Sequence, residues 1–145
     1  MRLEGAAATE ALGRRLAPML RPGDVVALFG DLGAGKTTLA RGILAGLGHD
    51  GEVASPTFPI VQPYEDLPLP VWHVDLYRVE DPGELEELGL DEARANAALI
   101  VEWPERLGER LWPHALRLVL RREGEGARAL TAEVPAAWGG RWPPR

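Results

Sequence analysis

Residues 25–38 read VVALFGDLGAGKTT, and this stretch decides the fold of the 145-residue chain. Its first five residues, Val25–Phe29, form a short apolar run that is typical of a strand buried on both faces of a sheet. The next eight match the pattern G-x-x-x-x-G-K-[ST] at every fixed position. Residues 37–47 then have the pattern of a helix, which Gly48 closes. The order of strand, glycine-rich loop and helix predicts a loop that binds phosphate.

The residue types in this loop suit a nucleoside triphosphate with Mg²⁺. Glycines let the backbone curl so that its N–H groups point at phosphate oxygens, and the helix N-terminus adds a partial positive charge. Lys36 is the only lysine of the chain, and its compact charge can reach between the β- and γ-phosphates. The Thr37 hydroxyl can ligate Mg²⁺. The loop residues that we expect to bind the nucleotide are Asp31, Leu32, Gly33, Ala34, Gly35, Lys36 and Thr37.

The rest of the chain extends this unit into an α/β fold. Two further apolar runs, 71–75 and 98–102, predict buried strands, and helical patterns cover 7–20, 84–88, 91–97 and 104–111. Residues 53–64 are extended by pattern, and 115–120 and 127–134 predict two strands around a turn at 123–126. We therefore predict a single P-loop NTPase domain over residues 1–135. Its mainly parallel central sheet is flanked by helices and has antiparallel strands at the edge. Residues 136–145 are predicted to be a flexible tail.

Two carboxylates are expected at the same sheet edge as the phosphate loop. Asp75 and Glu102 each end an apolar run, and ligands of parallel sheets lie at the carboxyl ends of the strands. An acid there can hold Mg²⁺ or orient the attacking water, although capping of the next turn is the alternative. His73 points to the same strand face as Asp75, and for it a packed core position is favoured over a functional one.

Two other polar groups have open interpretations. Ser55 and Thr57 lie in a proline-stiffened loop, where a hydroxyl could meet the metal or the attacking water. A turn with local hydroxyl–backbone bonds explains this loop equally well. Arg78 could neutralise phosphate charge, or form a surface ion pair with Glu80 or Asp81.

Composition limits the partners and the location. The 16 basic and 22 acidic residues give a net charge of −6, which argues against a chain that binds nucleic acid through its own bulk field. The densest arginine cluster, Arg117, Arg121 and Arg122, is expected to be solvated surface. Cysteine does not occur, and no apolar run is long enough to span a membrane. The N-terminus does not have the pattern of a secretory signal, so a cytoplasmic protein is expected.

The base can be predicted by exclusion. Guanine-specific P-loop proteins typically use an N-K-x-D segment. Here the only asparagine, Asn96, precedes alanine, and the only lysine lies in the phosphate loop. ATP is therefore favoured.

Four motifs in this order resemble the TsaE family of small bacterial P-loop ATPases. They are Gly30–Thr38, then Ser55-Pro56-Thr57-Phe58, then His73-Val74-Asp75-Leu76-Tyr77-Arg78, and finally Glu102-Trp103-Pro104-Glu105. The resemblance covers about residues 9 to 107. It implies a role in forming N6-threonylcarbamoyladenosine at position 37 of tRNAs that read codons beginning with A. It also implies an ATPase subunit that acts on the partners TsaB and TsaD, with TsaD as the transferase.

The same resemblance implies roles for individual residues. Thr37 and Glu102 resemble the Mg²⁺ ligands, Asp75 a further acid at the metal, and Thr57 a switch-like threonine. Lys36, Glu102, Asp75 and Thr57 are thus the expected catalytic residues. Further residues are expected near the nucleotide: Thr9, Thr38, Trp103, Glu105 and Arg128.

Two other functions remain open from the sequence. A small-molecule or nucleotide kinase would need an acceptor pocket, and the acidic segment 79–97 would repel an anionic acceptor. A nucleotide-binding interaction module with negligible turnover is the third alternative.

Overall fold

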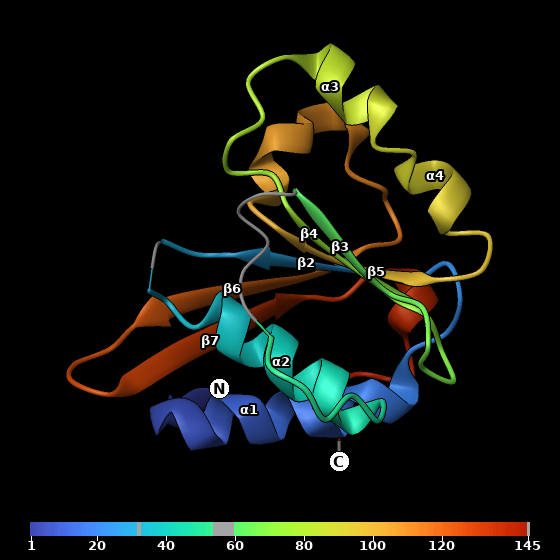
Figure 1. Cartoon of the computed structure of the whole chain (residues 1–145). Helices are drawn as coiled ribbons and strands as arrows, with labels where there is room; N and C mark the ends of the chain where they lie inside the picture. Colours follow the sequence, from blue (N-terminus) through green and yellow to red (C-terminus); the bar gives the residue numbers. More distant parts are fainter. Residues whose placement is uncertain (32, 54–59, 145) are drawn as a thin grey trace.

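The computed structural model describes residues 1–31, 33–53 and 60–144, and it builds them around one seven-stranded mixed sheet (Figure 1). The strand order is β1-β7-β6-β2-β5-β4-β3. The four central strands run parallel: β6 (Leu116–Arg122), β2 (Val25–Phe29), β5 (Ala98–Glu102) and β4 (Val71–Asp75). The outer strands pair antiparallel with their neighbours: β7 (Ala127–Glu133), β1 (Arg2–Glu4) and β3 (Val61–Tyr64). This confirms the predicted α/β class with a parallel centre.

Helices cover both faces of the sheet (Figure 1). One face carries α1 (Gly5–Leu16), the 3-10 turn η1 (Ala17–Met19) and α2 (Lys36–Gly46). The other face carries α3 (Pro82–Glu87), α4 (Leu90–Ala93) and the 3-10 segment η2 (Pro104–Arg110). Strand β2 shows why two cores form. Successive side chains alternate, so Val26 and Leu28 join the core under α1 and α2, whereas Val25 and Ala27 join the other.

Glycines bring α1 and α2 close together. A Cβ at Gly13 would lie 2.5 Å from the carbonyl oxygen of Leu39, and one at Gly42 would lie 2.2 Å from that of Glu10. Neither position has room for a side chain, so the two helix backbones pack directly on each other. This packing fixes α1 relative to the N-terminus of α2, where the phosphate loop ends.

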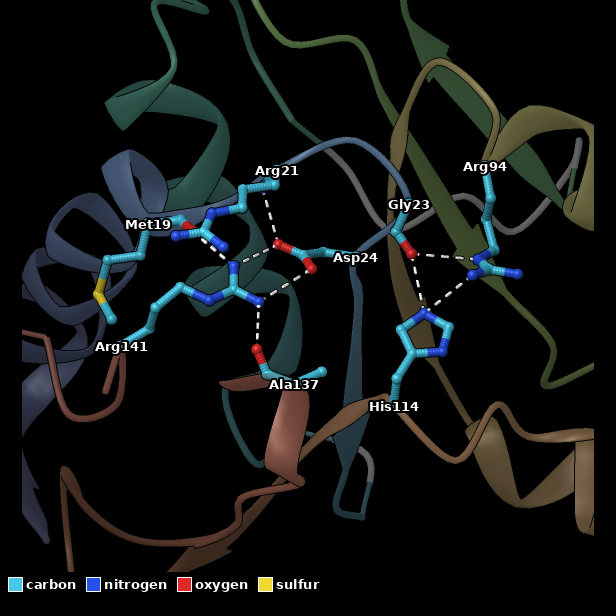
Figure 2. Close-up of polar contacts among 8 residues, drawn as sticks. All are labelled: Met19, Arg21, Gly23, Asp24, Arg94, His114, Ala137 and Arg141. Carbon is cyan, nitrogen blue, oxygen red and sulfur yellow. Dashed lines mark hydrogen bonds and ion pairs between the residues drawn. The ribbon is translucent and has the colours of Figure 1, made fainter. Parts of the chain in front are cut away.

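The structure differs from the sequence expectations at both ends of the chain. Strand β1 was not predicted, because only its central residue, Leu3, is buried and three residues give no periodic signal. The stretch predicted to be a flexible tail contains the 3-10 turn η3 (Ala136–Trp138), and Trp138 is fully buried in the core. Figure 2 shows Arg141 donating to both carboxylate oxygens of Asp24, at 2.7 and 3.2 Å. These contacts attach residues 136–142 to Asp24, which directly precedes strand β2.

None of the helices in the described residues is long and apolar enough to cross a bilayer.

The segment predicted as a helix over 104–111 is the 3-10 segment η2, with a break at Gly108 (φ 53°, ψ −123°).

Candidate nucleotide-binding site

The phosphate loop joins the end of β2 to the start of α2 and depends on glycine for its shape. Gly33 and Gly35 have φ values of 77° and 106°, in the left-handed region that favours glycine. Gly30 also has a positive φ, 150°, and a Cβ there would meet the carbonyl oxygen of Leu120 at 2.6 Å. Inside the loop, the Ala34 N–H donates to the carbonyl of Asp31 at 3.0 Å. The loop is therefore a tight backbone turn that ends at a helix N-terminus, as anion binding requires.

Lys36 lies at the start of α2 and is 5% exposed. Its Nζ donates to the carbonyl oxygen of Gly30 at 2.5 Å and stands 3.7 Å from the centroid of the Trp103 ring. Burial lowers the pKa of this ammonium below its usual value, and nearby carboxylates, Glu102 foremost, oppose the shift. Among the described residues, Lys36 thus contacts two uncharged groups, a carbonyl oxygen and an aromatic ring.

Glu102 is the polar centre of the site. It ends β5, is 2% exposed, and lies beside Asp75 because these two residues are register partners in the parallel pair β4–β5. The Thr37 hydroxyl donates to its carboxylate, at 3.3 Å from each oxygen. Nε2 of His73 lies 2.6 Å from Oε2 of the same carboxylate. The fold thus brings together Thr37, His73, Asp75 and Glu102 from three separate elements.

Asp75 makes the contact expected if its role is to cap the next turn. Its Oδ1 accepts the backbone N–H of Tyr77 at 2.9 Å, so the carboxylate caps the turn after β4. It is 7% exposed. The charge of this carboxylate also opposes the lowering of the Lys36 pKa, so it lies within electrostatic reach of the loop. Turn capping and a position at the site therefore occur together.

The donor set fits Mg²⁺ in company with phosphate. Thr37 and Glu102 supply hard oxygen atoms, and Mg²⁺ is usually held by one or two carboxylates together with substrate phosphates and waters. Across the part of the chain that the structure describes, no three His, Cys, Asp or Glu side chains are grouped to hold a metal. What these residues offer is accordingly a partial set of ligands that a nucleotide would complete.

Two arginines of the β6–β7 hairpin hold the outside of the loop. Arg122 and Arg128 are register partners on the two strands. The guanidinium of Arg128 donates to the carbonyls of Ala34 (2.9 Å) and Gly33 (3.2 Å), and that of Arg122 donates to Gly33 (3.2 Å). Arg122 is exposed, as expected, but its contact with the loop was missed. The sequence does contain a signal for this contact, because two arginines flank the 123–126 turn and can pair across it.

The other expected site residues surround this centre at different distances. Thr9 is buried, and its methyl carbon lies 3.8 Å from where a Cβ on Gly35 would stand. Trp103 adopts left-handed backbone angles (φ 57°, ψ 49°) and stacks at a tilt on Tyr77, with ring centroids 4.9 Å apart. Glu105 is exposed yet near enough to act on the charge of Lys36.

The remaining expected residues either show no side-chain hydrogen bond to this centre or fall outside the described residues. Arg78 is exposed, and no ion pair of it with Glu80 or Asp81 occurs within the described ranges. Thr38 lies half-buried in the first turn of α2. Leu32 and the Ser55–Phe58 segment, including Thr57, fall outside the described residues.

Comparison with known proteins supports one family. A family model described as "Threonylcarbamoyl adenosine biosynthesis protein TsaE" matches residues 3–130. The chain is 44% identical to the tRNA threonylcarbamoyladenosine biosynthesis protein TsaE of Bacillus subtilis over 85% of its own length and 77% of that protein. It is also 44% identical to the protein of the same name from Streptomyces coelicolor, over 90% of this chain and 91% of the other. Among solved structures, a crystal structure of Bacillus subtilis YdiB superposes with a TM-score of 0.77 at 36% identity. That match covers 91% of this chain and 82% of the other.

Proposed function

The chain belongs to the TsaE family, and from this premise we propose that it is a Mg²⁺-dependent ATPase of tRNA modification. Its role is in forming N6-threonylcarbamoyladenosine at position 37 of tRNAs that read codons beginning with A, in the cytoplasm. It acts with TsaB and TsaD and does not itself transfer the carbamoyl group. The observation that carries the ATPase assignment is the contact of Thr37, at the end of the phosphate loop, with the buried carboxylate of Glu102.

The loop motif and the geometry support the following roles. Backbone N–H groups of the loop and the α2 N-terminus would bind the phosphates, with Lys36 between the β- and γ-groups. Thr37 and Glu102 would hold Mg²⁺, which when bound neutralises charge on the β- and γ-phosphates. Asp75 lies beside Glu102 and would orient the attacking water. The water oxygen bonds to the γ-phosphorus as the bond to the bridging oxygen breaks. Of the two water protons, one stays on the phosphate product and the other is released to solvent.

The surface charge supports a division of labour with the partners. The net charge of −6 leaves the chain without a general attraction for tRNA. The segment over α3 and α4 is exposed and acidic, with Glu84, Glu86, Glu87, Asp91 and Glu92 on the surface. Contact with tRNA would accordingly be made by TsaB and TsaD, and the ATPase would reach the tRNA only through them.

ATP is the proposed nucleotide, because the chain cannot build the usual guanine-reading segment. The only asparagine, Asn96, is exposed just before β5 begins. The phosphate loop lies at the opposite, carboxyl ends of the parallel strands. Asn96 is therefore at the wrong end of the sheet to read a base bound beside the loop.

Reconstitution tests this function directly. The chain, TsaB, TsaD, tRNA, ATP, threonine and bicarbonate should together yield the modified nucleoside, and Lys36→Ala should abolish both this product and phosphate release. A folded Lys36→Ala variant with wild-type turnover would refute the assignment. Phosphate release that stays negligible with the partners would favour an interaction module, and transfer of labelled γ-phosphate to a nucleoside would favour a kinase.

A further inference from the structure

One short, buried contact in the site involves a residue that the proposed mechanism does not use. His73 stands in the middle of β4 and is fully buried. It is the register partner of Ile100, two residues before Glu102 on β5, so its side chain meets Glu102 diagonally across the two strands. The Nε2 to Oε2 distance is 2.6 Å. This is slightly below the range of about 2.7–2.9 Å for charge-assisted N–H···O bonds, so the two groups are in close contact.

The chemistry of this pair fixes which atom carries the hydrogen. Mg²⁺ binding requires the ionised carboxylate, which only accepts, so in the metal-binding state Nε2 of His73 carries the hydrogen and donates to Oε2 of Glu102. Nδ1 is buried and has no hydrogen-bond partner among the described residues. Within the described ranges, one ring nitrogen thus makes a short bond to the site while the other makes none, and the position of the buried ring is set by its place in the middle of β4.

The Thr37 hydroxyl does not fix the rotation of the Glu102 carboxylate as His73 does. Its oxygen lies 3.3 Å from both carboxylate oxygens, well beyond the usual 2.7–2.8 Å of an O–H···O bond. A long contact that is equal to two acceptors selects neither of them. The bond to His73 is therefore the one that sets the rotation of the Glu102 carboxylate.

We propose that His73 is a positioning residue: through its Nε2–H it holds the Glu102 carboxylate turned toward Thr37, in the orientation that receives Mg²⁺. This proposal rests on the proposed function, because it concerns the same metal site. Partners of this kind, which hold a metal-binding carboxylate without touching the metal, commonly change metal affinity ten- to a hundredfold when they are removed.

A purely structural role for His73 makes a different prediction. A core histidine could be replaced by any side chain of similar volume, and the buried, unpartnered Nδ1 is a cost that an apolar residue would not carry. If His73 only fills space, the identity of the atom that faces Glu102 should not matter.

Two variants separate these roles. In His73→Gln the side-chain amide nitrogen can reach the place of the imidazole Nε2, whereas in His73→Asn the same amide is one carbon too short. The affinity for ADP is measured by calorimetry, once with Mg²⁺ and once with EDTA. We expect the gain in affinity that Mg²⁺ provides to fall about ten- to a hundredfold in His73→Asn and to be largely restored in His73→Gln. Binding in EDTA should stay close to that of wild type in both variants, because the loop and Lys36 are unchanged, and this shows that the site is folded.

The wild-type protein supplies a test that does not depend on a variant folding. Nitrogen-15 NMR of the imidazole should show Nε2 protonated, and the Nε2–H signal should move when Mg²⁺ is added to the ADP complex. The proposal is overturned if His73→Asn keeps the wild-type Mg²⁺ effect, if both variants lose it equally, or if the Nε2–H signal does not respond to Mg²⁺. If instead wild type binds no ADP at all, it is the proposed function that fails.

Discussion

The close contact between α1 and α2 predicts how Gly42→Ala changes the free energy of unfolding. Two opposing effects decide whether this variant is less or more stable than wild type. A Cβ at this position would lie 2.2 Å from the carbonyl oxygen of Glu10, 2.9 Å from its carbonyl carbon and 3.0 Å from its Cα. All three atoms belong to the backbone of α1 and cannot rotate away. Since a carbon and an oxygen normally stay at least about 3.3 Å apart, the helices must separate by about 1 Å in Gly42→Ala.

The magnitude follows from comparing the two effects. Alanine is favoured over glycine inside a helix by about 1 kcal/mol. Forcing an extra carbon into a well-packed contact costs about 1–3 kcal/mol, and values near the top apply where backbone must move. Separation would also loosen Leu12, Leu39 and Ile43, which are fully buried around this contact. We expect a net loss of about 1–2 kcal/mol in the free energy of unfolding, or about 3–8 °C in Tm.

Thermal and urea unfolding followed by circular dichroism measure this loss, and Gly83 provides a matched control. A Cβ at Gly83 would lie 3.5 Å from a side-chain oxygen of Asp81, which is ordinary contact, so Gly83→Ala should be neutral or stabilise by about 0.4–1 kcal/mol. If Gly42→Ala is as stable as wild type or more stable, helix propensity outweighs packing and the argument from close approach fails.

Three further predictions concern the charged groups. Arg141→Met should lower the free energy of unfolding by about 3 kcal/mol in urea, because it leaves the mostly buried carboxylate of Asp24 without its cation; an unchanged midpoint would contradict this. Burial lowers the pKa of the Lys36 ammonium, whereas a bound phosphate favours its charged form. The ADP affinity should therefore fall as the pH rises through the lowered pKa that Lys36 has in the ligand-free protein. Calorimetry that shows constant affinity up to pH 10.5 would refute that reasoning. Arg128→Ala removes two hydrogen bonds to loop carbonyls and should weaken ADP binding about tenfold, with a small loss of Tm. Equal binding would show that the loop holds its shape without them.

The parts of the fold that the sequence predicts are those with local causes. Strands β2, β4 and β5 are continuous apolar runs, and the loop and α2 follow from the glycine pattern, so their limits agree with the structure within a residue. Asp75 and Glu102 could be placed at one edge because each ends such a run. Their direct pairing needs the strand order, in which β4 lies next to β5, and no local pattern specifies that order.

The remaining features depend on contacts between distant segments. Trp138 lies in a stretch rich in glycine and proline that has no periodicity, yet it is fully buried because it fits the core beside α1. Arg122 and Arg128 reach the loop only because β6 pairs with β2 and places the hairpin next to it. His73 has the sequence context of a core residue, and only the diagonal contact across β4 and β5 shows its link to Glu102.

The two buried charges at the centre of the site are held in complementary ways. The ammonium of Lys36 is held by a backbone carbonyl and an aromatic ring, and the carboxylate of Glu102 by a hydroxyl and an imidazole. Had the two formed a direct ion pair, a ligand would first have to break it. Because each is oriented through other groups, the lysine stays available to an anion and the carboxylate to a cation. On the proposed function, a nucleotide with Mg²⁺ would supply both, and we expect that neither the nucleotide nor Mg²⁺ binds as strongly alone.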